Sequence, residues 1–440
     1  MSSELIAVAG AKDGDEGKGK VIDALVSQGV DVCIKGQGGP NAGHTVVQII
    51  ESKEVVYAFH SLPSAILDPN VDCILGQGVL LNPTSLIAEI NGVEKRGIST
   101  SKLIISPSAH LITPVGQLFD EIEEERKGGQ KIGTTKQGMG PTSADKYARF
   151  GLRADLLRYP EELLNQLEPY LEYKRKIYQA LTGQDPTKKA ELDIDYYAEL
   201  VPEWSKRLGP QIASVEGILS KHFSQGHRIL VEGNQGTMLR IGSEDYPFVT
   251  SSETTIGGMI VGSGIPVSWI KSSDYRAILV QKAIDSKVGS GPFVTKMPSE
   301  MAELFQDETE IGVTSGRIRS VGFFDGVKAE WSNLINCPTE IAVPKMDVLK
   351  GKGEMSICEA YELDGRRVEE YPDNSRDLIR CKPIYSDRVY TFDKDVRGVQ
   401  SWDSLGPTEQ AYLNHIMEFY PGARLSMIGT GRSTEDMIYL

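Results

Sequence analysis

The stretch from Gly14 to Lys20 combines glycines, lysines and carboxylates at a spacing that could hold a phosphate group. It reads GDEGKGK and so has the spacing GxxxxGK, but Val21 stands where such loops usually carry a hydroxyl residue that contacts Mg²⁺. In a phosphate loop, successive backbone N–H groups and the N-terminus of the next helix hold the phosphates, while a lysine offsets their charge. Asp15 is the nearest carboxylate that could replace the missing metal contact. A tight turn with solvated charges is the alternative, because glycine-rich turns are common.

The same loop carries negative charge, which ordinarily repels phosphate. From Gly10 to Lys20 the sequence holds three acids and three lysines, so the formal charge of the loop is zero. We expect its lysines and backbone amides to face the anions. No pattern in the sequence explains why an aspartate stands at position 13 of this loop.

A second glycine-rich stretch, GQGGPNAGHT at residues 36–45, follows the next expected strand. Its glycines permit a ligand to approach the backbone closely. His44 is the only histidine in such a setting, and a catalytic role and a structural hydrogen bond are about equally supported by this stretch alone.

The stretch VPKMDVL places Lys345 two residues before Asp347, directly after an expected strand. A carboxylate there can accept from N1–H and the exocyclic amine of guanine, while the lysine stem covers the base. Adenine lacks this pair of donors, so the carboxylate selects guanine. Alone, the stretch also suits a salt-bridged loop, but an N-terminal phosphate loop favours the base site.

Three further polar loops could complete a cleft. The stretch GVTSGRIRS at 312–320 carries two arginines, which can bind carboxylate or phosphate with a forked guanidinium group. The stretch at 133–149 is another Gly/Thr-rich loop that ends in a basic residue, and VEGNQGT places Gln235 at a strand end. An exposed basic turn is the alternative for the first loop, and an amide bonded to backbone is the alternative for Gln235.

Each of these loops is positioned by an expected strand or helix. Apolar runs predict strands at residues 5–10, 30–36, 73–81, 102–112, 228–233, 277–284 and 340–349. Helical spacing predicts helices after the first glycine loop, at 118–127 and over much of 154–223. A β-loop-α-β unit near the N-terminus predicts parallel strands, whose carboxyl ends usually hold the ligands. We therefore expect one large α/β domain over residues 1–440, with a largely helical insertion around 154–225 and the loops facing one cleft.

The composition argues against several classes of protein. A formal charge of −14 over 440 residues makes non-specific nucleic-acid binding and an anionic membrane surface poor expectations. The five cysteines are widely spaced without a CxxC pair, as in reduced cytoplasmic proteins. No apolar run reaches the roughly 18 residues of a membrane span, and the first residues do not have the pattern of a signal peptide.

Taken in order, these stretches resemble the adenylosuccinate synthetase family from about residue 5 to residue 438. The shared motifs are GDEGKGK, NAGHT, GTT with GxGP, EGxQGT, YPxVTSSxTT, VGxGPF, TxGRxR, KxDVL and GTG. One such motif would be weak, but nine collinear motifs are very specific. The resemblance implies an α/β fold, with a large mainly parallel central sheet, flanking helices and insertions, related to the P-loop NTPases.

The resemblance also implies a reaction, the first committed step from IMP to AMP. The family couples GTP hydrolysis to the joining of IMP and L-aspartate. Asp15 would remove the N1 proton of IMP so that the 6-oxygen attacks the γ-phosphoryl group, and His44 would stabilise the developing charge as a proton donor. The amino group of aspartate would then displace phosphate from 6-phosphoryl-IMP. One Mg²⁺ per subunit would contact Asp15 and the carbonyl of Gly43, with Lys18 offsetting negative charge.

Other roles carry over position by position. The implied catalytic residues are Asp15, Lys18, His44 and Gln235. The implied IMP site comprises Asp15, Glu16, Gly17, Lys18, Asn41, Ala42, Gly43, His44, Thr135, Arg149, Gln235, Thr250 and Arg317. The implied aspartate site comprises Val313, Thr314, Ser315, Gly316, Arg317 and Arg319. The implied GTP site comprises Gly14, Asp15, Glu16, Gly17, Lys18, Gly19, Lys20, Gly43, His44, Thr45, Arg319, Lys345, Met346, Asp347, Gly429, Thr430 and Gly431. Arg149 is implied to reach the partner's site in a homodimer.

Several positions depart from the family's usual pattern and indicate a divergent member. Lys12 and Asp13 stand where Gln-Trp is usual, Ser143 replaces an aromatic residue, and Gly429 replaces a serine. None of these changes removes a residue assigned to chemistry. The alternative is a sibling ligase for another purine nucleotide or amino acid, but phage relatives that act on deoxyguanylate lack the aspartate matched by Asp15. A non-catalytic GTP-binding protein is a third reading, and the retained IMP and aspartate motifs argue against it.

Overall fold

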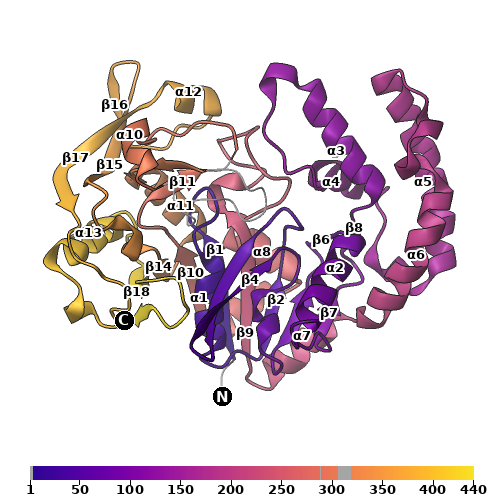
Figure 1. Ribbon diagram of the computed structural model, residues 1–440, viewed down its shortest axis with the longest axis horizontal. Helices are drawn as coiled ribbons and strands as arrows, with labels where there is room; N and C mark the ends of the chain where they lie inside the picture. Colours follow the sequence, from indigo (N-terminus) through magenta and orange to yellow (C-terminus); the bar gives the residue numbers. More distant parts are fainter. Residues whose placement is uncertain (1–2, 288, 306–318) are drawn as a thin grey trace.

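A large sheet forms the centre of the protein in the computed structural model, which describes residues 3–287, 289–305 and 319–440. Within these residues the sheet has nine strands in the order β19-β18-β14-β10-β1-β9-β2-β5-β7, and they cross Figure 1 from β18 on the left to β7 on the right. The strands are β1 (Glu4–Gly10), β2 (Val32–Lys35), β5 (Asp72–Leu75), β7 (Leu103–Ile105), β9 (Arg228–Gly236), β10 (Asp274–Val280), β14 (Glu340–Val343), β18 (Arg424–Gly429) and β19 (Met437–Tyr439). All neighbours pair in parallel except β18 and β19. The expectation of a mainly parallel sheet is confirmed.

Strand β1 lies near the middle of this sheet and is buried on both faces. Its side chains alternate between two apolar clusters, with Leu5 and Ala7 in one and Ile6 and Val8 in the other. A strand covered on both faces has a continuous apolar sequence rather than an alternating one, which is why the first residues predict a buried strand.

Helices cover both faces of the sheet. The helices are α1 (Lys18–Val26), α2 (Pro83–Glu94), α3 (Pro114–Arg126), α4 (Met139–Tyr147), α5 (Pro160–Thr182), α6 (Ile194–Leu208), α7 (Val215–Ser224), α8 (Ile256–Ser263), α9 (Val267–Ser272), α10 (Ser299–Glu303), α11 (Gly326–Asn336), α12 (Ser375–Arg380) and α13 (Pro407–Met417). Helices α1, α2, α5 and α6 pack with the cluster of Ile6, whereas α7, α8 and α13 pack with that of Leu5. The stretch 154–225, expected to be helical, contains α5, α6 and α7. Among the described residues, no helix is both long and apolar enough to cross a membrane.

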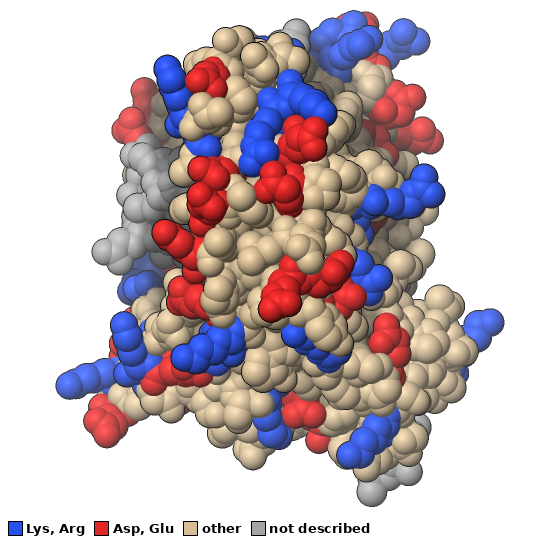
Figure 2. Space-filling model, turned by 90° about the vertical axis from the view of Figure 1, so that its right-hand side faces the viewer, with Lys and Arg blue, Asp and Glu red and all other residues tan. Residues whose placement is uncertain are grey.

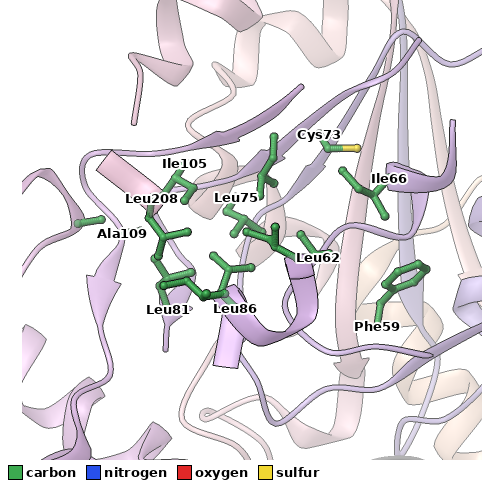
Figure 3. Packing of buried hydrophobic residues seen from close by; sticks show 14 of the residues in the cluster. Phe59, Leu62, Ile66, Cys73, Leu75, Leu81, Leu86, Ile105, Ala109 and Leu208 are labelled. Carbon is green, nitrogen blue, oxygen red and sulfur yellow. The ribbon is translucent and has the colours of Figure 1, made fainter. Parts of the chain in front are cut away.

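One apolar cluster joins the edge of the sheet to the helical stretch. Leu75 of β5 and Ile105 of β7 lie close to Leu86 of α2 and Leu208 of α6 (Figure 3). Each side chain is fully buried, which contributes roughly 1.5–3 kcal/mol per residue relative to exposure. On the outer side, which Figure 2 faces, acidic and basic side chains are interspersed, as is typical of solvent-facing helices.

Smaller sheets extend the central one. Their strands are β3 (His44–Ile50), β4 (Lys53–Phe59), β6 (Leu80–Leu81), β8 (His110–Leu111), β11 (Asp285–Lys287), β12 (Ser320–Gly322), β13 (Phe324–Asp325), β15 (Glu354–Leu363), β16 (Arg366–Val368) and β17 (Lys382–Thr391). The strands β3 and β4 form an antiparallel hairpin beside α1. Strand β11 pairs antiparallel with β12.

Two expected strands are each split in two. Residues 73–81 form β5 and β6 because the backbone turns between them, and a Cβ at Gly78 would lie only 2.1 Å from the carbonyl oxygen of Gly36. Residues 102–112 form β7 and β8, separated by a turn in which Ala109 N–H donates to the carbonyl of Ser106 (3.1 Å). Helix α3 begins at Pro114, four residues before the expected start, because proline suits the first helical turn.

Candidate active site

The loops that follow several parallel strands line one cavity of about 350 Å³ at the carboxyl edge of the sheet. The cavity is lined by Asp15, Gly17, Lys18, Gly19, Lys20, Gly43, His44, Thr45, Val47, Val56, Ala58, Arg319, Pro344, Lys345, Asp347, Val348, Gly431 and Arg432. The expected phosphate loop, the NAGHT stretch, the Lys-x-Asp stretch and the C-terminal glycine segment therefore meet, as predicted for loops that follow parallel strands.

Backbone geometry makes the loop between β1 and α1 suitable for an anion. Gly14, Asp15 and Gly17 have φ values of 88°, 62° and 88°, so the backbone is left-handed at three of four successive positions. Such turns point successive N–H groups toward one spot, and the N-terminus of α1 begins directly afterwards at Lys18. The Asp15 side chain is 26% exposed and lines the cavity.

Glu16 holds this loop from the inside. Its carboxylate accepts from the N–H groups of Lys12 (3.1 Å) and Gly14 (2.8 Å), and it forms an ion pair with Lys18 Nζ (2.7 Å). A Cβ at Gly10 would lie 2.3 Å from a carboxylate oxygen of Glu16, so the turn needs glycine there. The carboxylate of Glu16 is buried in the turn, which leaves its backbone for ligand contact.

The three lysines of the loop have different surroundings. Lys18 and Lys20 line the cavity, and Lys20 Nζ donates to the carbonyls of Gly431 (2.8 Å) and Asp436 (2.7 Å). Burial lowers the pKa of Lys20 to about 8. Lys12 instead forms an ion pair with Asp285, with Nζ 2.9 Å from both carboxylate oxygens. The expectation that all three lysines face the anions is therefore wrong for Lys12.

His44 begins β3 and is held by the carboxylate of Glu232, a residue to which no sequence motif gives a role. Its Nδ1 lies 2.6 Å from Oε1 of Glu232, a fully buried residue of β9. Burial opposes ionisation of Glu232, but Lys35, His44 and the N–H of Ser64 outweigh it and lower its pKa to about 2. An ionised carboxylate only accepts, so Nδ1 of His44 carries a proton.

The other ring nitrogen of His44 is available for a ligand. Nε2 is buried and has no hydrogen-bond partner within the described residues, although the side chain lines the cavity. Burial lowers the pKa of His44 and favours the neutral ring, while Glu232 opposes this effect. An anion beside Nε2 would favour the doubly protonated ring, which then donates from Nε2. The sequence feature that could have identified Glu232 is a carboxylate inside an otherwise apolar strand, because a buried charge needs a partner.

The candidate site for the guanine base contains a hydrogen-bond acceptor, on Asp347, that has no partner in the described residues. Oδ1 of Asp347 is buried and lacks a hydrogen-bond partner in the described part of the chain, and burial raises the pKa of this carboxyl. Asp347 lies in a 3₁₀ helix, η9 (Met346–Leu349), which begins after Lys345 at a φ of 65°. Gly429 fits closely here, because a Cβ would lie 2.9 Å from Cα of Pro344. The side chain of Met346 is instead buried in the apolar core.

The structure describes some, but not all, of the residues expected to bind IMP and aspartate. Asn41 Nδ2 donates to Oγ1 of Thr250 (3.2 Å), and both side-chain polar atoms of Gln235 are buried without a hydrogen-bond partner in the ranges described. Thr135 and Arg149 are exposed. Val313, Thr314, Ser315, Gly316 and Arg317 lie outside the described residues. Arg319 is described, is buried, and contacts the carboxylate of Asp15.

The donor set suits a hard cation held mainly by phosphates. Asp15 offers a partly exposed carboxylate to the cavity, and Gly43 lines the same space. Mg²⁺ commonly takes one or two protein carboxylates and completes its shell with water and substrate phosphates. Asp15 together with the Gly43 carbonyl is chemically compatible with this pattern.

Comparison with known proteins gives a consistent result. The adenylosuccinate synthetase family matches residues 7–438. The chain is 39% identical over 436 residues to adenylosuccinate synthetase of Bifidobacterium longum subsp. infantis, covering 99% of this chain and 98% of the relative. It is 42% identical over 381 residues to that of Nostoc punctiforme, covering 86% and 82%.

Solved structures agree with these matches. The fully ligated adenylosuccinate synthetase of Plasmodium falciparum superposes with a TM-score of 0.89 at 29% identity, covering 99% of both chains. A succinoaminodeoxyadenylate synthetase of cyanophage S-2L, bound to dGMP and dATP, superposes with a TM-score of 0.63 at 15% identity over 100% of this chain and 96% of that one. The second likeness concerns the fold alone.

Proposed function

This chain belongs to the adenylosuccinate synthetase family, and we propose that the cavity around Asp15 and His44 is where it performs that family's reaction. The protein is a GTP-dependent ligase that forms adenylosuccinate from IMP and L-aspartate, with GDP and phosphate as the other products. The observation that carries the site assignment is the single cavity in which the phosphate loop, His44 and Asp347 meet.

The residues that line the cavity favour one orientation of GTP, with its phosphates at the phosphate loop and its base at Asp347. Its phosphates belong at the N–H groups of the loop and the N-terminus of α1, where Lys18 and Lys20 add positive charge. Its base belongs beside Asp347, whose unpaired Oδ1 can accept from N1–H or the exocyclic amine of guanine. Adenine would leave that acceptor unsatisfied, so the pocket discriminates against ATP.

The first chemical step makes the 6-oxygen of IMP into a good leaving group. Asp15 removes the proton from N1, and the 6-oxygen attacks the γ-phosphorus, so that an O–P bond forms as the bond to GDP breaks. His44 donates from Nε2 to the charge that develops on the transferred group or the leaving oxygen. Glu232 supports this role as a positioning residue, because it fixes Nδ1–H and stabilises the charged ring.

The second step forms the carbon–nitrogen bond. The amino group of aspartate attacks C6 of 6-phosphoryl-IMP, the bond from C6 to the phosphorylated oxygen breaks, and inorganic phosphate leaves. We assign aspartate to the segment Val313–Arg317 and to Arg319, and IMP to Asn41, Gln235 and Thr250. The unpaired polar atoms of Asn41 and Gln235 support this assignment, since buried polar groups without partners are expected to bind ligand.

Asp15 and the carbonyl of Gly43 would hold Mg²⁺, which when bound neutralises charge on the β- and γ-phosphates. The guanidinium group of Arg319 contacts Asp15 and keeps its carboxylate oriented in the cavity.

We also propose a homodimer in which Arg149 reaches the IMP site of the second copy. Arg149 is exposed two residues after the end of α4, and Tyr147, the last residue of that helix, is 80% exposed. Tyr147 lines a groove of about 500 Å³ together with Val261, which is 68% exposed. Exposed apolar side chains along a groove are typical of an interface. A cytoplasmic location accords with the five free cysteines, and neither nucleic acid nor a membrane is a proposed partner.

A substrate panel tests the proposal. Purified protein is incubated with Mg²⁺, GTP or ATP, IMP or dGMP, and aspartate or other amino acids, and products are identified by mass spectrometry. We expect adenylosuccinate with IMP, aspartate and GTP. A different preferred nucleotide or amino acid would favour a sibling ligase, which the substitutions at Lys12, Asp13 and Ser143 motivate.

A further inference from the structure

Asp13 lies at the centre of a buried cluster of charges next to the phosphate loop. The cluster comprises Lys12, Asp13, Asp245, Asp285, Lys287, Asp325 and Lys328, each at most 6% exposed. Burying charge is costly unless every member is paired, so such a cluster fixes the segments that carry it.

Two lysines from different segments meet Asp13. Its Oδ1 lies 3.0 Å from Nζ of Lys287 in β11, and its Oδ2 lies 2.8 Å from Nζ of Lys328 in α11. Lys287 Nζ is also 3.1 Å from Oδ2 of Asp245. Burial alone would lower the pKa of Lys328, but Asp13, Asp245 and Asp325 raise it, so this lysine is charged.

Lys12 adds a second link between the same segments. Its ammonium group pairs with both oxygens of Asp285 in β11 and lies 3.7 Å from the centre of the Phe324 ring. Lys12 and Asp13 thus introduce opposite charges at neighbouring positions, and each finds its opposite charge in the three-residue strand β11. The two departures from the usual Gln-Trp form one charge-balanced unit.

These links continue to the reacting carboxylate. In β11, Lys287 pairs with Ser320 of β12, and Ser320 follows Arg319, which contacts Asp15. Asp13 is therefore connected to Asp15 by three contacts: its ion pair with Lys287, the pairing of β11 with β12, and the contact of Arg319 with Asp15. Figure 1 places β11 and α11 together above β1 and β10. Asp245 extends the path to the loop that carries Thr250.

We propose that Asp13 is a positioning residue that sets the phosphate loop against β11 and thereby holds Asp15 and Arg319 facing each other in the cleft. The role of Asp15 in catalysis rests on the function proposed above. Asp13 is buried and is not among the residues that line the cavity around Asp15 and His44. It acts by fixing the distance between the loop and β11 through two ion pairs, and small displacements of a reacting group cost large factors in rate.

Substitution Asp13→Asn tests this role, because it keeps the shape and removes the charge. We expect kcat to fall about tenfold or more, while the dissociation constant of a non-hydrolysable GTP analogue changes by less than about threefold. The matched control is Glu340→Gln. Glu340 is a buried carboxylate at the amino end of β14, paired with Arg276 (2.8 Å) and Arg424 (2.9 Å), at the opposite edge of the sheet.

A double variant separates positioning from folding stability. Asp13→Asn combined with Lys328→Met leaves Lys287 paired with Asp245 and removes the ammonium group that the single change strands. We expect the urea midpoint to recover toward wild type while kcat stays low. If Asp13→Asn alone does not fold, the double variant carries the same kinetic test.

Three outcomes overturn the proposal. They are a kcat of Asp13→Asn within twofold of wild type, an equal loss of kcat in Glu340→Gln, and recovery of kcat together with stability in the double variant. Wild-type protein that forms no product from IMP, aspartate and GTP would instead contradict the proposed function, so the two failures are distinguishable.

Discussion

Nδ1 of His44 lies 2.6 Å from the carboxylate of Glu232, although the two residues are 188 positions apart in the chain. The pair fixes the protonated nitrogen of the ring and leaves Nε2 for the cavity. It also places a stable negative charge behind the ring, which favours the charged form once phosphate is bound.

Substitution Glu232→Gln should lower kcat about 100-fold, which corresponds to roughly 2.7 kcal/mol of transition-state stabilisation. The amide can still accept from Nδ1–H, but it no longer stabilises the charged ring. The KM for GTP should change little, because Glu232 is fully buried and does not line the cavity proposed for nucleotide. Steady-state kinetics on the folded protein measure this, with Glu340→Gln as the control. Equal losses of kcat in both variants would contradict a role through His44.

The low pKa of Glu232 also predicts a pH dependence of stability. Its pKa is about 2 in the folded protein against an ordinary value of 4.5. Between these values the unfolded chain binds more protons than the folded protein, so the free energy of unfolding rises with pH. The contribution of Glu232 is fully present above about pH 4.5 and is lost as the pH falls toward 2. The difference of about 2.5 units corresponds to on the order of 3 kcal/mol. Urea unfolding at pH 5 and pH 3 should show the advantage of wild type over Glu232→Gln shrinking at pH 3, and an unchanged difference would refute this origin.

Substitution Asp15→Ala should cost at least ~3 kcal/mol of barrier lowering, on the scale of removing an acid–base group. Binding of a GTP analogue should persist, because the N–H groups of the loop remain. Single-turnover measurements with IMP and GTP report formation of the phosphorylated intermediate. Activity within threefold of wild type would rule out the base role.

Substitution Asp347→Asn should change the preferred purine triphosphate from GTP toward xanthosine triphosphate. The amide can donate to the 2-oxygen of xanthine, whereas the carboxylate accepts from the 2-amino group of guanine. Exchange of one buried polar partner is worth about 1–3 kcal/mol, so the ratio of the two kcat/KM values should shift by roughly tenfold or more. A constant ratio would mean that Asp347 does not read the base.

Mixing two inactive variants tests whether Arg149 acts across a dimer. Arg149→Ala and Asp15→Ala should each have little activity. In an equal mixture that exchanges subunits, about half of the dimers contain one copy of each variant. Each mixed dimer has one site that combines an intact Asp15 with an intact Arg149 from the other copy, so about a quarter of all sites should regain wild-type activity. Co-purification of differently tagged subunits in the presence of IMP confirms exchange, and a mixture of demonstrated heterodimers without activity would remove the trans assignment.

Local patterns in the sequence were enough to predict the sheet and the main loops. The apolar run of β1, the glycines of the phosphate loop and the Lys-x-Asp stretch each carry their signal within a few residues. The splitting of residues 73–81 into two strands was missed because it depends on backbone packing between Gly78 and Gly36, which are distant in sequence.

Pairings between distant charges could not be predicted. Lys12 meets Asp285 across 273 positions, and Asp13 meets Lys328 across 315. No local periodicity encodes such partners, because they are set by which strand ends and helices the fold brings together. The sequence could identify Asp13 only as an unexplained departure.

The contact of Lys20 with the carbonyls of Gly431 and Asp436 has a consequence for synthesis of the chain. Lys20 is separated from these two residues by 411 and 416 positions, yet Lys20 and Gly431 line the same cavity. Translation produces the phosphate loop first and the segment that completes the proposed GTP site more than four hundred residues later. A nascent chain arrested before residue 431 therefore lacks the partner of Lys20 at Gly431, and we expect it to bind nucleotide less tightly than the full chain.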